Sequence, residues 1–298
     1  MKAAVAFLLL ATFCFAQDVK RPKITGIDHV DFYTTDPAKN DHFYTGVLGL
    51  AHAEPIEPGQ TQRYVAGTQW VGYSAAPDPS VRNRMNHAAF ATDDAAALKK
   101  YLASKQIKVP DALTKWPNGS KSFVVKDPED HAIEFIQHAK SKIKTEGMSD
   151  PVSQRMIHVG FVVKNREEEN KFYIDTLGFR PYWHGGMKDD QTDWVALQVP
   201  DGSEWLEYML NIKPDASLNT IGVMNHISLG VADIKQANAK LESHGWTPSA
   251  SEKMQLGRDG KYQLNVYDPD HTRVELMEFK PAEKPCCSEF TAAHPEGR

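Results

Sequence analysis

The sequence predicts an α+β protein built from four consecutive segments, each of which reads as a strand, a helix and three further strands. The segments span residues 24–76, 84–139, 155–212 and 223–280. Three observations support this: a repeated pattern of histidines and glutamates, repeated flanking sequences, and a constant offset between the halves. Odd segments resemble each other more than they resemble even ones, so the unit of duplication is a pair.

Each half of the chain contains two histidines and one glutamate in a repeated pattern. Each histidine stands at the start of a predicted strand, and the glutamate lies in the last strand of that half. The members of the pattern are His29, His87 and Glu134 in the first half, and His158, His226 and Glu275 in the second. The flank MNHAAFA matches MNHISLG, and FYTGVLGL matches FYIDTLGF. His29 and His158 lie 129 positions apart, and the same offset relates Tyr44 to Tyr173 and Gly49 to Gly178. Such constant spacing indicates a duplicated architecture.

Local signals define the elements in order. The stretch ITGIDHVDFYT alternates as a half-buried strand does, Asp36 and Pro37 then begin a helix, and Gly49 ends it. In the even segments, Asp127-Pro128 and Asp268-Pro269 mark tight turns before the final strands AIEFIQH and RVELMEF.

Length and composition predict two domains. A chain of 298 residues with 41% hydrophobic residues is long enough for two ordinary domains, each with its own core. The charged stretch 140–154 carries little apolar periodicity, and we place the boundary there, between domains at 24–139 and 155–280. This linker favours pairing of segment 1 with 2 and 3 with 4; the alternative, 1 with 4 and 2 with 3, would group His87, Glu134, His158 and Glu207. The tail 281–298 is predicted to be disordered.

The two ends of the chain carry further signals. Residues 1–16 have the layout of a secretory signal peptide, which predicts a secreted or periplasmic protein without a membrane span after cleavage. Cleavage would leave Cys286 and Cys287, whose adjacency disfavours a bond between them and favours an intermolecular bridge or free thiols. The net charge of -5 provides no basic stripe for nucleic acid. No P-loop, dinucleotide loop or GxSxG motif is present. We expect the protein to bind a small-molecule substrate and to be a monomer or a homodimer.

Strand alternation places the histidines and glutamates on one face of each sheet. Around His226, the residues Ile227 and Leu229 point to one face while His226 and Ser228 point to the other. Glu134, Glu207 and Glu275 are each flanked by apolar residues, so each buried carboxylate needs a partner. Two imidazoles and one carboxylate form the facial triad of non-haem iron sites.

The two halves differ in their fourth ligand. In the second half, His158, Glu207, His226 and Glu275 follow one another at intervals of 49, 19 and 49 residues. In the first half, Gly72 takes the place of Glu207, so the second half is predicted to be the stronger metal site and the first a three-ligand site or a relic. Histidines outside the register are expected at the surface, and these are His42, His52, His131, His138, His184, His244 and His271.

These motifs resemble the vicinal oxygen chelate superfamily, which includes glyoxalase I, extradiol dioxygenases and bleomycin resistance proteins. The resemblance covers residues 24–280 and rests on the four βαβββ modules, the FYxxxLGF-type helix ends, and the DP turns followed by IE or VE. It implies that the modules pair into two cup-shaped mixed β-sheet domains, with a divalent metal ion (Fe, Ni, Zn, Co or Mn) on the concave face.

The resemblance implies three alternative functions. The spacing of the second half is similar to glyoxalase I, a metal-dependent lyase in which Glu275 or Glu207 would move a proton; export argues against it, because reduced glutathione belongs to the cytosol. An iron-dependent extradiol-type dioxygenase would use His158, His226 and Glu275, but Asn265 stands where that group has a tyrosine. A non-catalytic, resistance-type binding protein is the third. We favour an exported, metal-dependent enzyme acting on a small oxygenated substrate that chelates the metal.

Overall fold

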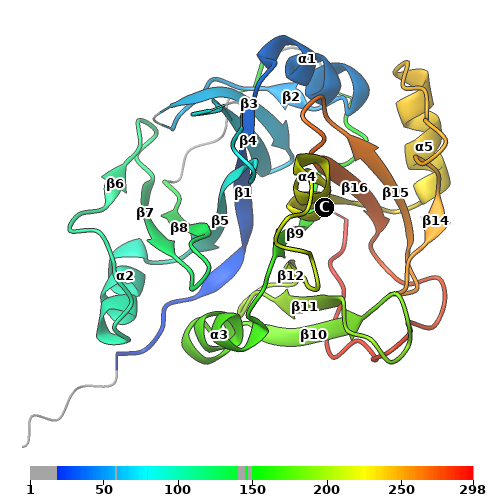
Figure 1. Ribbon diagram of the computed structural model, residues 1–298. Helices are drawn as coiled ribbons and strands as arrows, with labels where there is room; N and C mark the ends of the chain where they lie inside the picture. Colours follow the sequence, from blue (N-terminus) through cyan, green and yellow to red (C-terminus); the bar gives the residue numbers. More distant parts are fainter. Residues whose placement is uncertain (1–18, 58, 79, 140–144, 147–149, 298) are drawn as a thin grey trace, which may run out of the picture.

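The computed structural model describes residues 19–57, 59–78, 80–139, 145–146 and 150–297. Two curled, eight-stranded mixed sheets lie side by side (Figure 1), which confirms the predicted α+β fold. The predicted signal peptide and most of the predicted linker lie outside the described residues. Within the part of the chain that is described, no helix is both long and apolar enough to cross a bilayer.

The first sheet has the strand order β2-β3-β4-β1-β5-β8-β7-β6. Its strands are β1 (Ile24–Thr34), β2 (Ala51–His52), β3 (Gln60–Ala66), β4 (Gln69–Ala75), β5 (Met85–Thr92), β6 (Thr114–Lys115), β7 (Lys121–Lys126) and β8 (Ala132–Gln137). The helices of this half are α1 (Pro37–Asp41), continued by the π-helix η1 (His42–Val47), and α2 (Ala95–Ser104). Strand β1 runs parallel to β4 and antiparallel to β5, so β1 and β5 join the first two segments.

The second sheet repeats this topology in the order β10-β11-β12-β9-β13-β16-β15-β14. Its strands are β9 (Met156–Val162), β10 (Arg180–Gly185), β11 (Trp194–Gln198), β12 (Trp205–Met209), β13 (His226–Val231), β14 (Gln255–Leu256), β15 (Tyr262–Tyr267) and β16 (Arg273–Glu278). Its helices are α3 (Arg166–Asn170), continued by η2 (Lys171–Thr176), α4 (Leu218–Met224) and α5 (Ile234–Ser243). Each sheet therefore joins consecutive segments, 1 with 2 and 3 with 4.

Helix ends follow the sequence signals. The side chain of Asp36 accepts a hydrogen bond from the Lys39 amide at 3.2 Å and caps α1. Gly49, with φ of +68°, follows the end of η1, and Gly178, with φ of +81°, occupies the same place after η2. A left-handed backbone at these two positions favours glycine, which is why both helices stop there.

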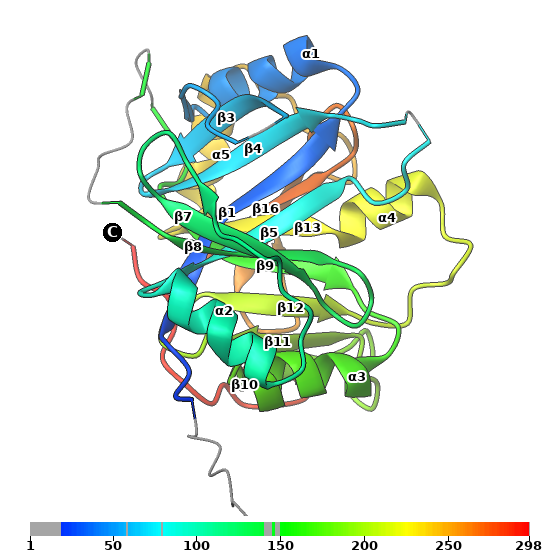
Figure 2. The same ribbon diagram turned by 90° about the vertical axis from the view of Figure 1, so that its left-hand side faces the viewer.

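The halves share one apolar core, whereas the composition had suggested a core for each. The main buried cluster runs from Ile24 in β1 to Leu276 in β16. Phe90 of β5 meets Phe179 of the second half edge-on, with ring centroids 5.3 Å apart. Helix α2 lies beside the α3–η2 helix (Figure 2), and the Tyr101 hydroxyl donates to the Thr176 carbonyl at 2.8 Å. Packing of helices across the junction merges the two cores, which no linear periodicity reveals.

Two related polar contacts join the halves at the predicted DP turns. Asp268, before β16, accepts a hydrogen bond from the Tyr73 hydroxyl of β4 at 2.7 Å. Asp127, before β8, accepts one from the Tyr173 hydroxyl of η2 at 3.0 Å. All four residues are buried. Each DP turn thus fixes its own final strand and also holds the opposite half.

Glu169 is a fully buried carboxyl group at this junction, and it makes stability depend on pH. Burial, with Asp127 and Glu129 nearby, raises its pKa to about 8. The folded protein therefore keeps a proton on Glu169 that the unfolded chain releases near pH 4.5, so this group makes the folded state less stable as pH rises from about 4.5 to 8. Its own contribution has a slope of at most about 1.4 kcal/mol per pH unit.

We expect Glu169→Gln to remove this part of the pH dependence and to leave the variant more stable than the wild type at pH 8.5, with a smaller difference at pH 5. Urea unfolding at the two pH values measures the change. Glu167→Gln on the exposed side of α3 is the matched control. Parallel pH profiles for wild type and Glu169→Gln would contradict the assignment.

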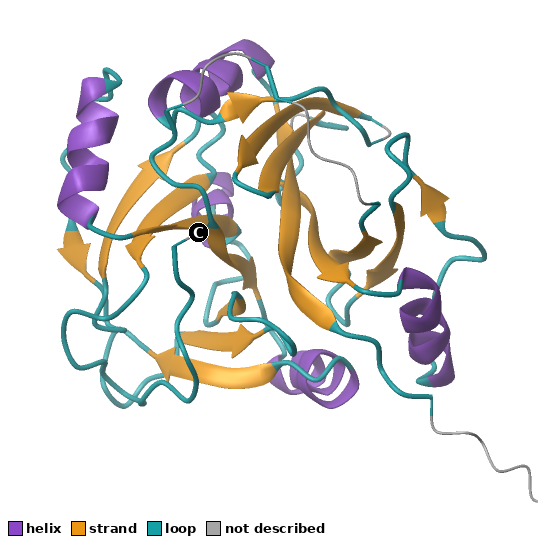
Figure 3. Cartoon of the chain, turned by 180° about the vertical axis from the view of Figure 1, so that it is seen from behind, coloured by secondary structure: helices purple, strands orange, loops and turns teal. Residues whose placement is uncertain are grey.

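The C-terminal segment 281–297, expected to be disordered, packs over the second half. The Phe290 ring lies 4.9 Å from that of Tyr182, and the Thr291 amide donates to the Tyr182 carbonyl at 3.1 Å. The Trp183 indole donates to the Cys286 carbonyl at 3.2 Å. One aromatic anchor and these backbone bonds order a segment whose polar composition suggested otherwise. The segment covers the cup formed by the second sheet, which lies beside the first sheet. Helices α2 and α5 lie at the two outer sides of the molecule (Figure 3).

Cys286 and Cys287 form a disulfide with each other, contrary to the expectation of an intermolecular bridge or free thiols. Their Cα atoms lie 3.8 Å apart, the distance across one trans peptide. Cys287 has φ of +71°. The disulfide between these adjacent residues thus occurs together with a left-handed backbone conformation at Cys287.

Candidate metal centres

The structure brings the predicted residues of the second half together on the concave face of its sheet. His158, His226 and Glu275 come from β9, β13 and β16, which are neighbours in the sheet. The two histidine Nε2 atoms lie 3.0 Å apart, and His158 Nε2 lies 3.3 Å from Glu275 Oε2. Glu207 of β12 is somewhat farther, with Oε2 at 3.5 Å from His226 Nε2 and 3.7 Å from His158 Nε2. Two imidazoles and two carboxylates therefore face one point.

Local contacts orient His226. Its Nδ1 lies 2.9 Å from the Met224 carbonyl, to which it donates, so the lone pair of Nε2 faces the cluster. Gly160 on the adjacent β9 makes room for the ring, because a Cβ there would lie 2.1 Å from it. The small residue opposite His226 is thus a requirement of the site.

Two cations enter the same cup. Arg273, two residues before Glu275 on β16, donates from Nη2 to His226 Nε2 at 2.7 Å. Lys261 is fully buried, and its Nζ lies 4.4 Å above the Trp205 ring without a hydrogen-bond acceptor among the described residues. Neither residue is among the candidate site residues predicted from the sequence, although Lys261 precedes Asn265 by four positions and so falls on the same face of the strand pattern. A metal ion bound by His226 would have to displace Arg273 from the lone pair of Nε2.

Burial controls the protonation of the second-half cluster. It raises the pKa of Glu207 and of Glu275 to about 7 each, against the lowering effect of Arg273. Burial, with Arg273 nearby, also lowers the pKa of both His158 and His226 well below the ordinary value. The imidazoles are therefore neutral near pH 7, the form that binds metal, while the carboxyl groups exchange protons in the same range.

A cavity of about 370 Å³ opens next to Glu207 and Glu275. Its walls include Trp183, Trp194 and Trp205, and Phe290 of the C-terminal segment closes one side. Arg273 also lines it. The cluster therefore faces a space with the size and the apolar walls of a small-molecule site.

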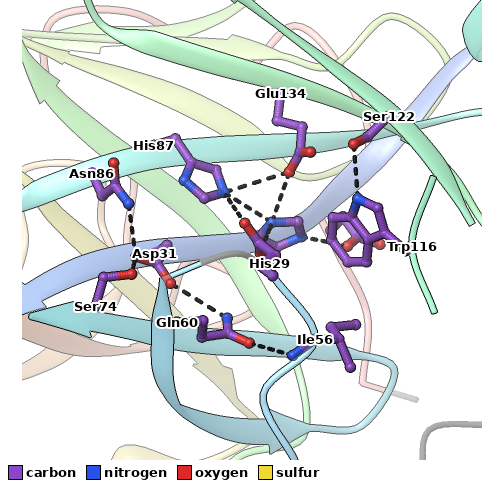
Figure 4. A network of polar contacts seen from close by, with 12 residues as sticks. His29, Asp31, Ile56, Gln60, Ser74, Asn86, His87, Trp116, Ser122 and Glu134 are labelled. Atoms are coloured by element: carbon purple, nitrogen blue, oxygen red, sulfur yellow. Dashed lines mark hydrogen bonds and ion pairs between the residues drawn. The ribbon is translucent and has the colours of Figure 1, made fainter. Parts of the chain in front are cut away.

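In the first half, the structure adds a carboxylate that sequence reasoning missed. His29 of β1, His87 of β5 and Glu134 of β8 converge as predicted (Figure 4), with the histidine Nε2 atoms 3.1 Å apart. Glu57, in the connection from β2 to β3, places Oε1 at 3.0 Å from His29 Nε2 and Oε2 at 3.3 Å from His87 Nε2. This half therefore brings together four candidate ligands, one more than the three predicted from the sequence.

Gly72 and Glu57 together explain the difference between the halves. A Cβ at Gly72 would lie 2.4 Å from both Asp31 Oδ2 and Gln60 Nε2, so the strand position used by Glu207 is closed here. Glu57 reaches the cluster from a loop instead. Because strand alternation assigns no face to loop residues, only its position as an acidic residue in the AEPIEPG turn hinted at it.

Charge in the first half is paired within the cluster. Burial alone would lower the pKa of His29, but Glu57, Asp28 and Glu134 raise it well above its ordinary value. Burial would likewise raise the pKa of Glu134, but bonds to His29 and His87 lower it. Neighbouring carboxylates therefore raise the pKa of the first-half imidazoles, whereas burial lowers the pKa of the second-half imidazoles.

Two histidines predicted to lie at the surface make structural contacts; His138 is exposed as predicted, whereas His131 is partly buried. His138 pairs through Nε2 with Asp28 Oδ2, behind the first-half cluster. His131 pairs through Nδ1 with Asp127 Oδ2 at 2.8 Å and stacks on Phe161. Both follow or precede β8 in the turn region, where strand register no longer predicts exposure.

Paired cup-shaped sheets of βαβββ modules with His and Glu clusters on their concave faces define a class of proteins. Sequence models described as the Glyoxalase/Bleomycin resistance protein/Dioxygenase superfamily match residues 26–135 and residues 157–264. The chain belongs to this superfamily, as the resemblance had implied. A search of curated proteins found no match to this sequence.

Solved structures with the same fold include a glyoxalase and an extradiol dioxygenase. The Mn(II)-bound glyoxalase from Novosphingobium aromaticivorans is 17% identical, with a TM-score of 0.66 over 90% of this chain and 86% of the other. Homoprotocatechuate 2,3-dioxygenase from Brevibacterium fuscum, in its anaerobic complex with 3,4-dihydroxyphenylacetate, is 17% identical, with a TM-score of 0.63 over 91% and 86%. At these identities the likeness establishes the fold alone.

Proposed function

We propose that the protein is a divalent-metal-dependent enzyme acting on a small oxygen-bearing substrate in the cup of the second half. The observation that supports this most directly is the convergence of His158, His226, Glu275 and Glu207 beside the 370 Å³ cavity. These residues would hold the ion, which would supply positive charge toward substrate oxygens.

The chain's own groups suit glyoxalase-like isomerase or lyase chemistry. Glu275 and Glu207 both line the cavity, and whichever of them is released from the ion would accept a proton from a substrate carbon and return it to another. Arg273 and Lys261 favour negative charge developing on the substrate, and the tryptophan walls limit water. Glu275 is the better candidate for the proton carrier if Glu207 remains on the metal.

An iron-dependent dioxygenase is the second candidate, and one observation favours it. His158, His226 and Glu275 form a compact group whose ligand atoms lie within 4.8 Å of one another, and Glu207 is not part of it. A triad of this type leaves positions for substrate and dioxygen. Asn265, whose side chain lines the cavity opposite Glu275 in the sheet, stands where that class has a tyrosine.

Two assays on purified full-length protein separate these candidates. We expect a bound divalent metal, conversion of the hemithioacetal of methylglyoxal and a thiol, and no oxygen uptake. Catechol-dependent oxygen uptake that follows iron content would instead establish the dioxygenase. Tight binding of a catechol or hemithioacetal without metal or turnover would support a binding protein and contradict both enzymes. Measurement of metal by mass spectrometry, before any addition, is the first step.

Export is part of the proposal and rests on the N-terminal sequence. Expression of the whole chain in a bacterium, followed by separation of periplasm from cytoplasm and N-terminal sequencing, tests it. We expect a mature chain that begins at Gln17. An uncleaved chain in the cytoplasm would contradict it.

A further inference from the structure

We infer that the first half holds a second divalent ion with a structural role, in which Glu57 completes a four-residue shell with His29, His87 and Glu134. This goes beyond the function proposed for the second half and is independent of it. The ligand is a small divalent cation that accepts nitrogen and oxygen donors, such as zinc or manganese.

The first step is the geometry of convergence. Glu57 Oε1 and Glu134 Oε2 lie 3.0 and 3.1 Å from the same atom, His29 Nε2, and both oxygens are buried. Glu134 Oε2 also lies 3.4 Å from His87 Nε2. The donor atoms thus share one point instead of forming separate pairs, which is the arrangement of ligands around an ion.

The second step is the support behind the ligands. His29 Nδ1 lies 2.6 Å from Asp28 Oδ1, and this bond leaves Nε2 to face the cluster. Asp28 is itself held by His138. Metal-binding histidines commonly donate their other nitrogen to a carboxylate in this way, which orients the ring and strengthens the ligand. In the second half, His226 Nδ1 donates to a backbone carbonyl instead of a carboxylate, and His158 Nδ1 has no partner among the described residues.

The third step is enclosure. The His29 ring stacks on Trp70 with centroids 3.7 Å apart, and the Trp116 ring lies 5.7 Å from His29 (Figure 4) and 6.1 Å from Trp70. Ala53, Val65 and Ile136 pack with these tryptophans over the concave face. The four candidate ligands are at most 12% exposed. A shell of four protein ligands under an apolar cover is typical of a structural site, whereas a catalytic ion keeps an open position.

The ion would tie the β2–β3 connection to the sheet. The Ile56 amide donates to Gln60 Oε1 at 3.0 Å, and Gln60 Nε2 donates to Asp31 Oδ2 at 3.3 Å (Figure 4). These bonds hold the loop next to Glu57, and ligation of Glu57 would fix its tip. Loss of the ion would therefore release the loop and lower stability without touching the cavity of the second half.

The test uses the full-length protein, stripped with a chelator and reloaded with zinc or manganese. In a His226→Ala/Glu275→Ala background, which disables the second-half cluster, we expect one equivalent of metal per chain and a rise in melting temperature of roughly 5 °C on loading. Glu57→Gln in that background should lose both. The control Glu54→Gln, an exposed glutamate of the same loop, should keep both.

Two results would overturn the inference. One is a His226→Ala/Glu275→Ala protein that takes up no metal after reloading, a measurement that needs no change in the first half. The other is a folded Glu57→Gln variant, checked by circular dichroism, with the same metal content and melting temperature as Glu54→Gln. Neither result bears on metal or turnover in the second half of the wild type, so the two proposals fail separately.

Discussion

Replacing both His226 and Glu275 by alanine should remove the ion of the second half and lower kcat/KM by about 10³-fold or more. The change deletes a neutral imidazole, a carboxylate and the preferred proton carrier, and it leaves Arg273 beside a site with fewer negative groups. Elemental analysis and steady-state kinetics with the hemithioacetal of methylglyoxal measure the two effects.

A matched histidine control is available on the same half. His184 is exposed on β10, and its backbone alone bonds to Ser288, so His184→Ala should leave both metal content and turnover unchanged. Glu57→Gln should lower metal content while sparing turnover. A double variant at His226 and Glu275 that retained the full metal content of the wild type would reject the second-half site.

Asp268→Ala should destabilise the protein by about 3 kcal/mol or more at pH 7.5. Asp268 is buried, and its carboxylate accepts hydrogen bonds from the Tyr73 hydroxyl at 2.7 Å and from the amides of Asp270 and Thr272 at 2.9 and 2.8 Å. Its loss leaves buried donors unpaired in the turn before β16 and removes one of the two DP-turn contacts between the halves. Denaturant unfolding gives the free energy of unfolding.

Tyr73→Phe tests the contact between the halves alone, because it leaves the hydrogen bonds within the turn before β16 in place. It removes one hydroxyl and should cost about 1.5 to 2 kcal/mol, less than Asp268→Ala. In the double variant the two losses should not add, because the same hydrogen bond is removed twice. Fully additive losses, or an Asp268→Ala protein as stable as the wild type, would show that this carboxylate does not join the halves.

The candidate site was predictable where it lies on strands. His158, His226 and Glu275 occupy regular positions of adjacent strands, and alternation alone assigns them to one face. Their convergence within hydrogen-bonding distance is observed, while metal binding by any of them stays a prediction. Glu57 was not predictable, because it reaches the first cluster from a loop of 7 residues between β2 and β3 whose path depends on Gln60 and Asp31.

The buried positions of the two cations and the packing of the C-terminal segment could not be predicted from the sequence either. Lys261 has a side chain long enough to reach either water or the cup, and the rings of Trp205 and Phe290 bury it in the cup. Arg273 is directed into the same cup by its hydrogen bond to His226. The order of segment 281–297 depends on Phe290 finding a partner in Tyr182, which lies more than 100 positions away in the sequence.

By itself, the sequence determined the fourfold βαβββ repeat, the ends of the helices, and the face on which the seven predicted histidines and glutamates lie. These follow from short-range rules: strand alternation, helix caps and glycine at positive φ. Only the tertiary structure decided that the halves share a core, that Glu57 replaces the carboxylate absent at Gly72, and that Arg273 meets His226. These depend on contacts between distant segments, whose free energy comes from burial and complementary charge and leaves no periodic trace along the chain.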